Sequence, residues 1–260
     1  MQGRISKSAT GAALAALITV TGAFALPASA EVPRKDGHPD LSGFYNFTRI
    51  DPDAPAARKL ISEVPEGAVF MKDGGAYEFP PNEYGGLKPK PDVLAEAQKW
   101  SPQEELKVEN ICKKPSIIYA IQGPFPMEIT QGRDMIVMQM EYFDMVRVIF
   151  MDGRGHPDED APHTLLGHSI GHWEGDELVV DTTHLEPATI TNNGLNHSED
   201  AHLVERFRLS DDGQTLYSTE YIEDPTNLEN TGYRLMAWKK HPGEHIYPYE
   251  CDPFAYQEDE

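Results

Sequence analysis

Three histidines, a serine and two aspartates lie close together in one short stretch of the chain, GHSIGHWEGDELVVDTTHL (167–185). Histidine titrates near neutral pH, so a histidine that a carboxylate orients can accept and donate protons during catalysis. His168 and Asp181 are the candidates in this stretch for such chemistry. They predict a proton-transfer site that needs no cofactor.

Ser169 offers a second chemistry, because Gly-His-Ser-Ile-Gly matches the G-x-S-x-G nucleophile elbow. The elbow requires a strand before the serine and a helix after it. The segment 177–183 is instead rich in valine and threonine and follows the turn Glu174-Gly175-Asp176, which predicts a β-hairpin. A serine hydrolase that uses Ser169 therefore stays as an alternative.

Alternation along the hairpin decides which side chains can meet. His168 and His172 fall on one face, too far apart along a strand to hold one ion, while Ser169 falls on the other. No H-E-x-x-H motif occurs, so we expect no bound metal and no cofactor. Four further histidines lie in or beside predicted loops and could converge on one rim: His156, His163, His197 and His202.

A carboxylate also falls on an otherwise apolar strand face. Glu205 lies in the predicted strand 201–209 among alternating apolar residues, so an interior position would require a partner. The candidates are Arg147, in the predicted strand 146–151, and a histidine from the stretch 167–185. Such a pair is either a structural ion pair or part of an active site.

The remaining candidates complete an acid–base set. Tyr142 follows the strand 135–141, and His197 lies in a loop rich in glycine and asparagine that leads to Glu205. We expect His168 and His197 to act as acid and base, Glu205 and Asp181 to orient them or act as bases, and Tyr142 and Arg147 to stabilise negative charge.

The order of predicted elements indicates the fold. About nine or ten strands, without strand–helix–strand alternation, predict one all-β domain, an antiparallel up-and-down barrel. A proline-rich arm, 51–115, precedes most of them, with helices expected at 92–100 and 101–110. The strands are expected at 40–47, 127–131, 135–141, 146–151, 167–173, 177–183, 201–209, 215–222, 233–239 and 245–249.

The first thirty residues predict export. Residues 1–30 combine Arg4 and Lys7 with an apolar run and a final Ala-Ser-Ala, which is typical of a signal peptide cleaved after Ala30. The domain is then expected to span 31–260, in the periplasm or outside the cell. Cys112 and Cys251, the two cysteines, are expected to pair there.

Several segments resemble a large family of exported bacterial β-rich proteins of unassigned function. They are GHPDLSGFY, PFPMEITQ, VRVIFMDGRGHP, GHSIGHWEGDELVVDTTHL, HSEDAHLVERFR and a late Tyr-Glu-Cys. The opening DLSGFY is also similar to the start of lipocalin-like (calycin) barrels. The resemblance implies an exported bacterial β-protein and brings no site residues with it.

Charge and composition narrow the partners. A net charge of −21 excludes nucleic acid as the expected partner, and no segment after the leader is apolar enough to span a membrane. We expect a small apolar or aromatic ligand or substrate in the barrel lumen. The residues expected to line the lumen are Trp173, Trp238, Tyr142 and the methionines 135, 138 and 140. The alternative is that these residues form an ordinary barrel core. The preferred function is a cofactor-free lyase or isomerase; the alternatives are a ligand carrier and the serine hydrolase. A homodimer stays open.

Overall fold

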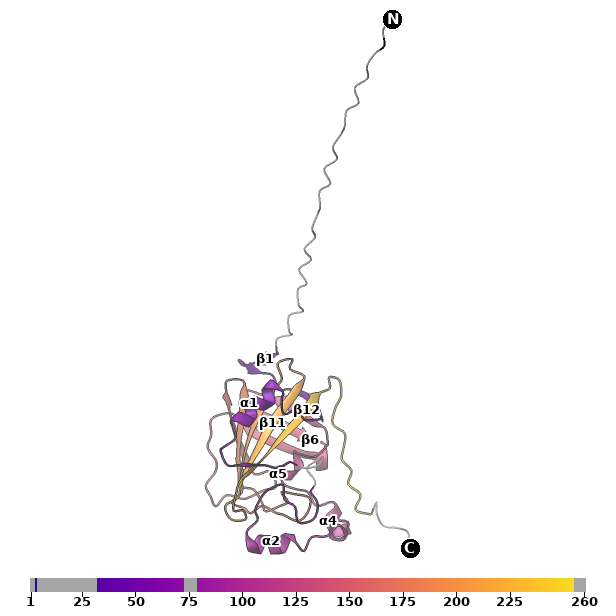
Figure 1. Cartoon of the computed structure of the whole chain (residues 1–260), viewed down its shortest axis with the longest axis vertical. Helices are drawn as coiled ribbons and strands as arrows, with labels where there is room; N and C mark the ends of the chain where they lie inside the picture. Colours follow the sequence, from indigo (N-terminus) through magenta and orange to yellow (C-terminus); the bar gives the residue numbers. More distant parts are fainter. Residues whose placement is uncertain (1–2, 4–31, 73–78, 255–260) are drawn as a thin grey trace. The chain divides into compact units, whose positions relative to one another are not determined.

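Nine strands join edge to edge into a closed β-barrel (Figure 1). The computed structural model describes residues 3, 32–72 and 79–254 of the chain. Each strand pairs with the next one, and β12 pairs with both β3 and β11, which closes the ring and confirms the predicted barrel. The strands are β3 (Gly43–Phe47), β5 (Met127–Gln131), β6 (Met135–Met140), β7 (Met145–Phe150), β8 (His168–Glu174), β9 (Glu177–Thr183), β10 (His202–Leu209), β11 (Thr215–Glu223) and β12 (Gly232–Lys240).

One pair of strands departs from the expected antiparallel order. β7 and β8 run parallel, with Ile149 opposite Ser169, while the other eight pairs of the ring are antiparallel. A closed ring with an odd number of strands cannot alternate in direction all the way round, so one parallel pair is required. The connection 151–167 must therefore return along the barrel before β8 begins. Lipocalin barrels have eight strands, so this ring differs from theirs in number.

Strand alternation fills the interior of the barrel with side chains. Along β10 every second residue is buried, from Leu203 to Leu209, and the residues between them are half-buried. Trp238 and Phe207 are the largest apolar side chains of this core, and Met138 and Met140 pack in it as well. These residues are therefore ordinary core, whereas Met135 is exposed.

The chain before β5 wraps the barrel with short helices. Helices were expected at 92–100 and 101–110, and Ser101 does cap one of them, accepting a hydrogen bond from the Glu104 amide at 3.4 Å. None of the helices in the described residues is long and apolar enough to cross a membrane. The elements before β5 that lie outside the barrel are β1 (Arg34–Lys35), β2 (His38–Pro39), α1 (Pro55–Ser62), β4 (Val69–Phe70), α2 (Pro91–Ala97), α3 (Pro102–Glu105), α4 (Val108–Ile111) and α5 (Ile117–Ala120).

Helix α1 and strand β4 were not expected from the sequence. Pro55 starts α1, where its missing N–H costs nothing, and Ala57 and Leu60 place a small apolar stripe on one side. That stripe packs against Tyr217 of β11 and Leu235 of β12, on the outer face of the barrel (Figure 1). Strand β4 adds to β12 in parallel. The arm thus covers part of the outside of the barrel.

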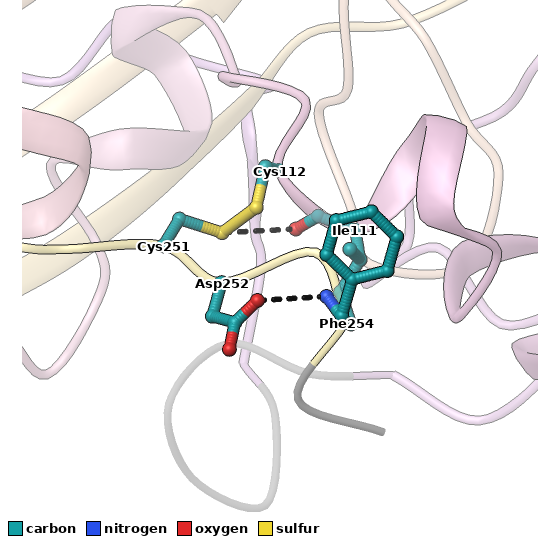
Figure 2. The surroundings of a disulfide bond; sticks show 5 residues. All are labelled: Ile111, Cys112, Cys251, Asp252 and Phe254. Carbon is teal, nitrogen blue, oxygen red and sulfur yellow. Dashed lines mark hydrogen bonds between the residues drawn. A yellow bond between two sulfur atoms is a disulfide. The ribbon is translucent and has the colours of Figure 1, made fainter. Parts of the chain in front are cut away.

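The segment after β12 is not the strand expected at 245–249. Both edges of β12 are already paired, with β11 on one side and with β3 and β4 on the other, and Pro248 has no N–H to donate. The segment instead lies against the turn between β6 and β7, where the Tyr249 amide donates to Asp144 Oδ1 at 3.1 Å. A disulfide joins Cys251 to Cys112 near the end of α4, as expected (Figure 2).

Candidate functional site

The ribbon of β8 and β9 places His168 and Asp181 on the outer face of the barrel. Asp181 lies opposite Ile170 of β8 and opposite Val204 of β10. His168 and His202 are therefore its diagonal neighbours on the two flanking strands, a separation that long side chains span. The strand register brings two histidines and one carboxylate together without any loop.

A third histidine completes a chain of hydrogen bonds. His156, from the connection 151–167, approaches Asp181 with Nε2 at 2.9 Å from Oδ1 and His168 with Nδ1 at 3.0 Å from Nδ1. His202 Nε2 lies 3.0 Å from the same Asp181 oxygen. We call His156, His168, Asp181 and His202 the histidine cluster. One carboxylate thus holds two imidazoles directly and a third through His156.

The carboxylate fixes which ring nitrogens carry protons. Asp181 can only accept while it is ionised, so Nε2 of His156 donates to it. In neutral His156 the other nitrogen, Nδ1, then accepts a hydrogen bond from Nδ1–H of His168. The lone pair of His168 is left on Nε2. His168 is thereby oriented as a base, with Asp181 behind it to stabilise the charge that it gains.

The environment moves the pKa values of the two outer histidines apart. The hydrogen bond to Asp181 raises the pKa of His202 despite partial burial, and the carboxylate of Glu223, 3.5 Å from Nδ1, acts in the same direction. Burial lowers the pKa of His168, and the nearby His156, His184 and Arg154 lower it further. Between the two pKa values His202 is protonated and His168 is neutral, which is the pairing of a general acid with a general base.

The cluster is half-buried rather than enclosed. The exposed fraction of the side chain is 21% for His156, 33% for His202 and 37% for Asp181. Phe150 covers one face of His168 with ring centroids 5.2 Å apart, and the Arg154 guanidinium lies over Phe150. A small molecule can therefore reach the histidines from solvent while aromatic groups restrict one side.

The other loop histidines join the cluster only in part. His184 lies beside His156 with ring centroids 6.3 Å apart, and His163 lies beside His184. Within residues 32–72 and 79–254 no group of three or more histidine, cysteine, aspartate or glutamate side chains is arranged to hold a metal ion.

Arg147 and Glu205 do pair, but on the inner side of the same ribbon. Their side chains are 1% and 0% exposed and form an ion pair in the barrel interior. Arg147 also donates to Ser169 Oγ at 3.0 Å and to Thr182 Oγ1 at 2.8 Å. The pair is a structural one, because it is closed off from the histidine cluster by the strands themselves.

The position of Ser169 does not match the nucleophile elbow that the serine hydrolase requires. Its hydroxyl is buried between Arg147 and Thr182, while His168 and Asp181 project from the opposite face of the ribbon. The segment that follows is β9, not a helix. A nucleophile that is enclosed in the barrel interior has no base beside it and no access to an acyl group.

His197 and Tyr142 lie in other parts of the molecule. His197 is buried, with Nδ1 donating to the Ser198 carbonyl and Nε2 accepting from Ser116 Oγ, each at 2.8 Å. Burial lowers the pKa of His197. Tyr142 stacks on Phe125, with ring centroids 4.5 Å apart, and burial raises its pKa. Neither residue belongs to the histidine cluster.

Two members of the cluster, His156 and His202, were considered in the sequence only as possible rim ligands for a metal. His202 points outward from an alternating strand. Pairing β9 with β10 in the sequence would have placed it diagonally across from Asp181. His156 gave no such signal, because its place depends on the path of an irregular connection.

Comparison with known proteins does not assign this site. No protein-family model matches the chain, and a search of curated proteins finds no relative.

Proposed function

We propose that this protein is an acid–base enzyme, a cofactor-free lyase or isomerase, whose proton transfers pass through the histidine cluster. The observation that carries the proposal is the hydrogen-bonded cluster itself: His202 bonds directly to Asp181, and His168 reaches the same carboxylate through His156. A base and an acid that coexist at one pH are what the removal of a proton at one atom and its return at another require.

Each side chain has a definite part in this chemistry. His168 Nε2 takes a proton from a carbon or oxygen of the substrate, and its Nδ1–H bond to His156 passes the gained charge toward Asp181. His202 donates Nε2–H to Asp181, so the proton that it supplies to the group that becomes negative is the one on Nδ1, where Glu223 is the more distant partner at 3.5 Å. His156 is a positioning residue, since it acts through His168.

The test is exchange of substrate hydrogen with solvent. The protein is incubated in D₂O with separate sets of small carbonyl compounds, aromatic compounds with benzylic C–H groups, and hydroxy acids, and deuterium incorporation is followed by NMR. We expect incorporation into one set and its loss in His168→Gln. A matched control is His245→Gln, which changes an exposed histidine in the segment after β12.

The rival function is a carrier that binds a small molecule without changing it. Binding without exchange in any set, together with equal pKa values for His168 and His202 in an NMR titration, would replace the enzyme by this carrier. Unequal pKa values for His168 and His202 that become equal in Asp181→Asn support the enzyme even before its substrate is known. Such a result would show that Asp181 couples the titrations of the two histidines.

We further infer that the chain is exported and belongs with the family of exported bacterial β-proteins that its motifs resemble. The Cys112–Cys251 disulfide supports this, because such bonds persist in oxidising compartments. The expected signal peptide lies outside the described residues, apart from Gly3. Expression in a bacterial host, followed by mass measurement of the periplasmic product, tests it: a chain starting at Glu31 supports export, and a reduced, uncleaved cytoplasmic chain refutes it.

A further inference from the structure

A cleft opens at the end of the barrel where β5, β7 and β8 finish. Its volume is about 390 Å³, within the range of small-molecule sites. Its lining comes from the hairpin of β1 and β2, from the end of β5 and the turn after it, from the residues after β7 and from the C-terminal end of β8. The cleft is thus built from four segments that the barrel brings together, and it does not include the histidine cluster.

Aromatic and soft apolar groups form one side of the cleft. The rings of Trp173 and His38 are nearly parallel, with centroids 4.7 Å apart and planes 5° apart. A Cβ atom at Gly171 would come within 2.6 Å of the Met151 sulfur, so the glycine allows Met151 to lie directly against β8. A flat ring and a polarisable thioether together favour a planar aromatic ligand.

Positively charged side chains also line the cleft. Lys35 donates to the Gln131 carbonyl, which fixes its position on the wall, and Arg133 lies 3.6 Å from Asp36. The formal charge of the lining, with histidines neutral, is Lys35 plus Arg133 minus Asp36, or +1, in a chain whose net charge is −21. A locally positive cleft on so acidic a protein attracts an anion.

We propose that this cleft binds a small planar aromatic carboxylate, its ring against Trp173 and Met151 and its carboxylate toward Lys35 and Arg133. The volume accommodates a ligand of one or two rings. The site goes beyond the proposed acid–base function and does not depend on it, because none of the four residues of the histidine cluster lines the cleft.

Benzoate is the probe, and its neutral counterpart benzyl alcohol is the first control. Each is titrated into the purified protein and followed by amide and indole shifts in ¹H–¹⁵N NMR. We expect benzoate to saturate shifts at Gly171, Gly153 and the Trp173 indole, and benzyl alcohol to bind about 10-fold more weakly, since it lacks the charge. Cyclohexanecarboxylate, which has the charge without the flat ring, should also bind about 10-fold more weakly.

Variants locate the site. Trp173→Leu and Arg133→Gln should each weaken benzoate binding about 10-fold. Trp100→Phe and Lys88→Gln, outside the cleft, should leave it unchanged. Benzoate that binds no better than benzyl alcohol, that shifts amides elsewhere, or that fails to saturate by about 10 mM would overturn the proposal. The ligand comparison uses the unchanged protein, so it stands even if a variant does not fold.

Discussion

The inner and outer faces of the barrel wall formed by β7, β8, β9 and β10 carry similar polar groups in different environments. Facing inward, Arg147 and Glu205 pair with side-chain exposures of 1% and 0%, and the hydroxyls of Ser169 and Thr182 complete the contacts of the arginine. Facing outward, Asp181 holds its histidines with 37% of its side chain exposed. A single residue step along a strand separates the two faces.

The two faces differ in burial rather than in residue type, and burial decides whether their charged groups can exchange protons with solvent. Neither charge of a buried ion pair can be removed alone without a large loss of stability, because the remaining charge would be buried without a partner. A half-exposed carboxylate between histidines can gain and lose protons at little cost to the fold. The same types of charged group therefore stabilise the barrel on one side and supply a titratable site on the other.

The largest effect should come from breaking the inner pair. Arg147→Met leaves Glu205 buried without its partner, and we expect the free energy of unfolding to fall by about 3–5 kcal/mol in urea titrations. Adding Glu205→Leu should restore most of the loss, because the double variant leaves no unpaired charge in the interior. Arg58→Met, at an exposed pair on α1, should change stability by less than about 1 kcal/mol. A single variant as stable as the unchanged protein would contradict this account.

The inner face is the part of the molecule that sequence predicts best. Alternation along a strand is a local rule, so it places Glu205 on an otherwise apolar face and makes Arg147 one of its candidate partners, and the structure pairs the two. The barrel itself followed from the spacing of the turns. The parallel pair of β7 and β8 did not, because strand direction depends on closing a ring with an odd strand count.

The outer site was only half predictable, for a physical reason. His168 and Asp181 share a ribbon, and the rule of alternation places both on one face. His156 arrives from an irregular connection, and its position depends on contacts with residues far along the chain. His197 and Tyr142 lie in loop or turn positions, where local rules say little, and the structure places both away from the histidine cluster.

A second carboxylate of the interior, that of Glu220, should make the stability of the barrel depend on pH. Burial raises the pKa of Glu220 to about 7, despite the guanidinium of Arg234, and the charge of Glu205, its partner across β10 and β11, acts in the same direction as burial. An unfolded glutamate loses its proton near pH 4.5, so the folded protein binds one more proton between about pH 4.5 and 7. Stability should therefore fall as pH rises through that window.

The size of this fall is about 3 kcal/mol for a single group shifted that far. Glu220→Gln does not titrate, so the difference in stability between the unchanged protein and this variant should decline from pH 4.5 to 7 and then stay level. Urea titrations at intervals of pH measure it. A difference that is constant across the window would show that Glu220 is ionised throughout.

The next effect concerns the outer face, where function rather than stability should change. Asp181→Asn removes the carboxylate that raises the pKa of His202, so that pKa should fall, as seen in imidazole shifts by NMR. Any solvent exchange catalysed through His168 should drop about 100-fold. The free energy of unfolding should change by less than about 1 kcal/mol, since the site is half-exposed. A large loss of stability would make Asp181 a structural residue and remove the contrast with Arg147.

The smallest expected effect is the contribution of Glu223 to stability through its contact with His202. Glu223→Gln removes a carboxylate that lies 3.5 Å from His202 Nδ1 and is itself exposed, so we expect a loss of about 0.3–0.5 kcal/mol. Because His202 has a raised pKa when folded, this contribution is complete below about pH 6.5 and disappears as pH rises through the folded value. Stability differences between the two proteins at pH 5.5 and 9 measure it. A difference of the same size at pH 5.5 and pH 9 would mean that Glu223 stabilises the barrel by another contact and that the outer face is less separate from the fold than Asp181 suggests.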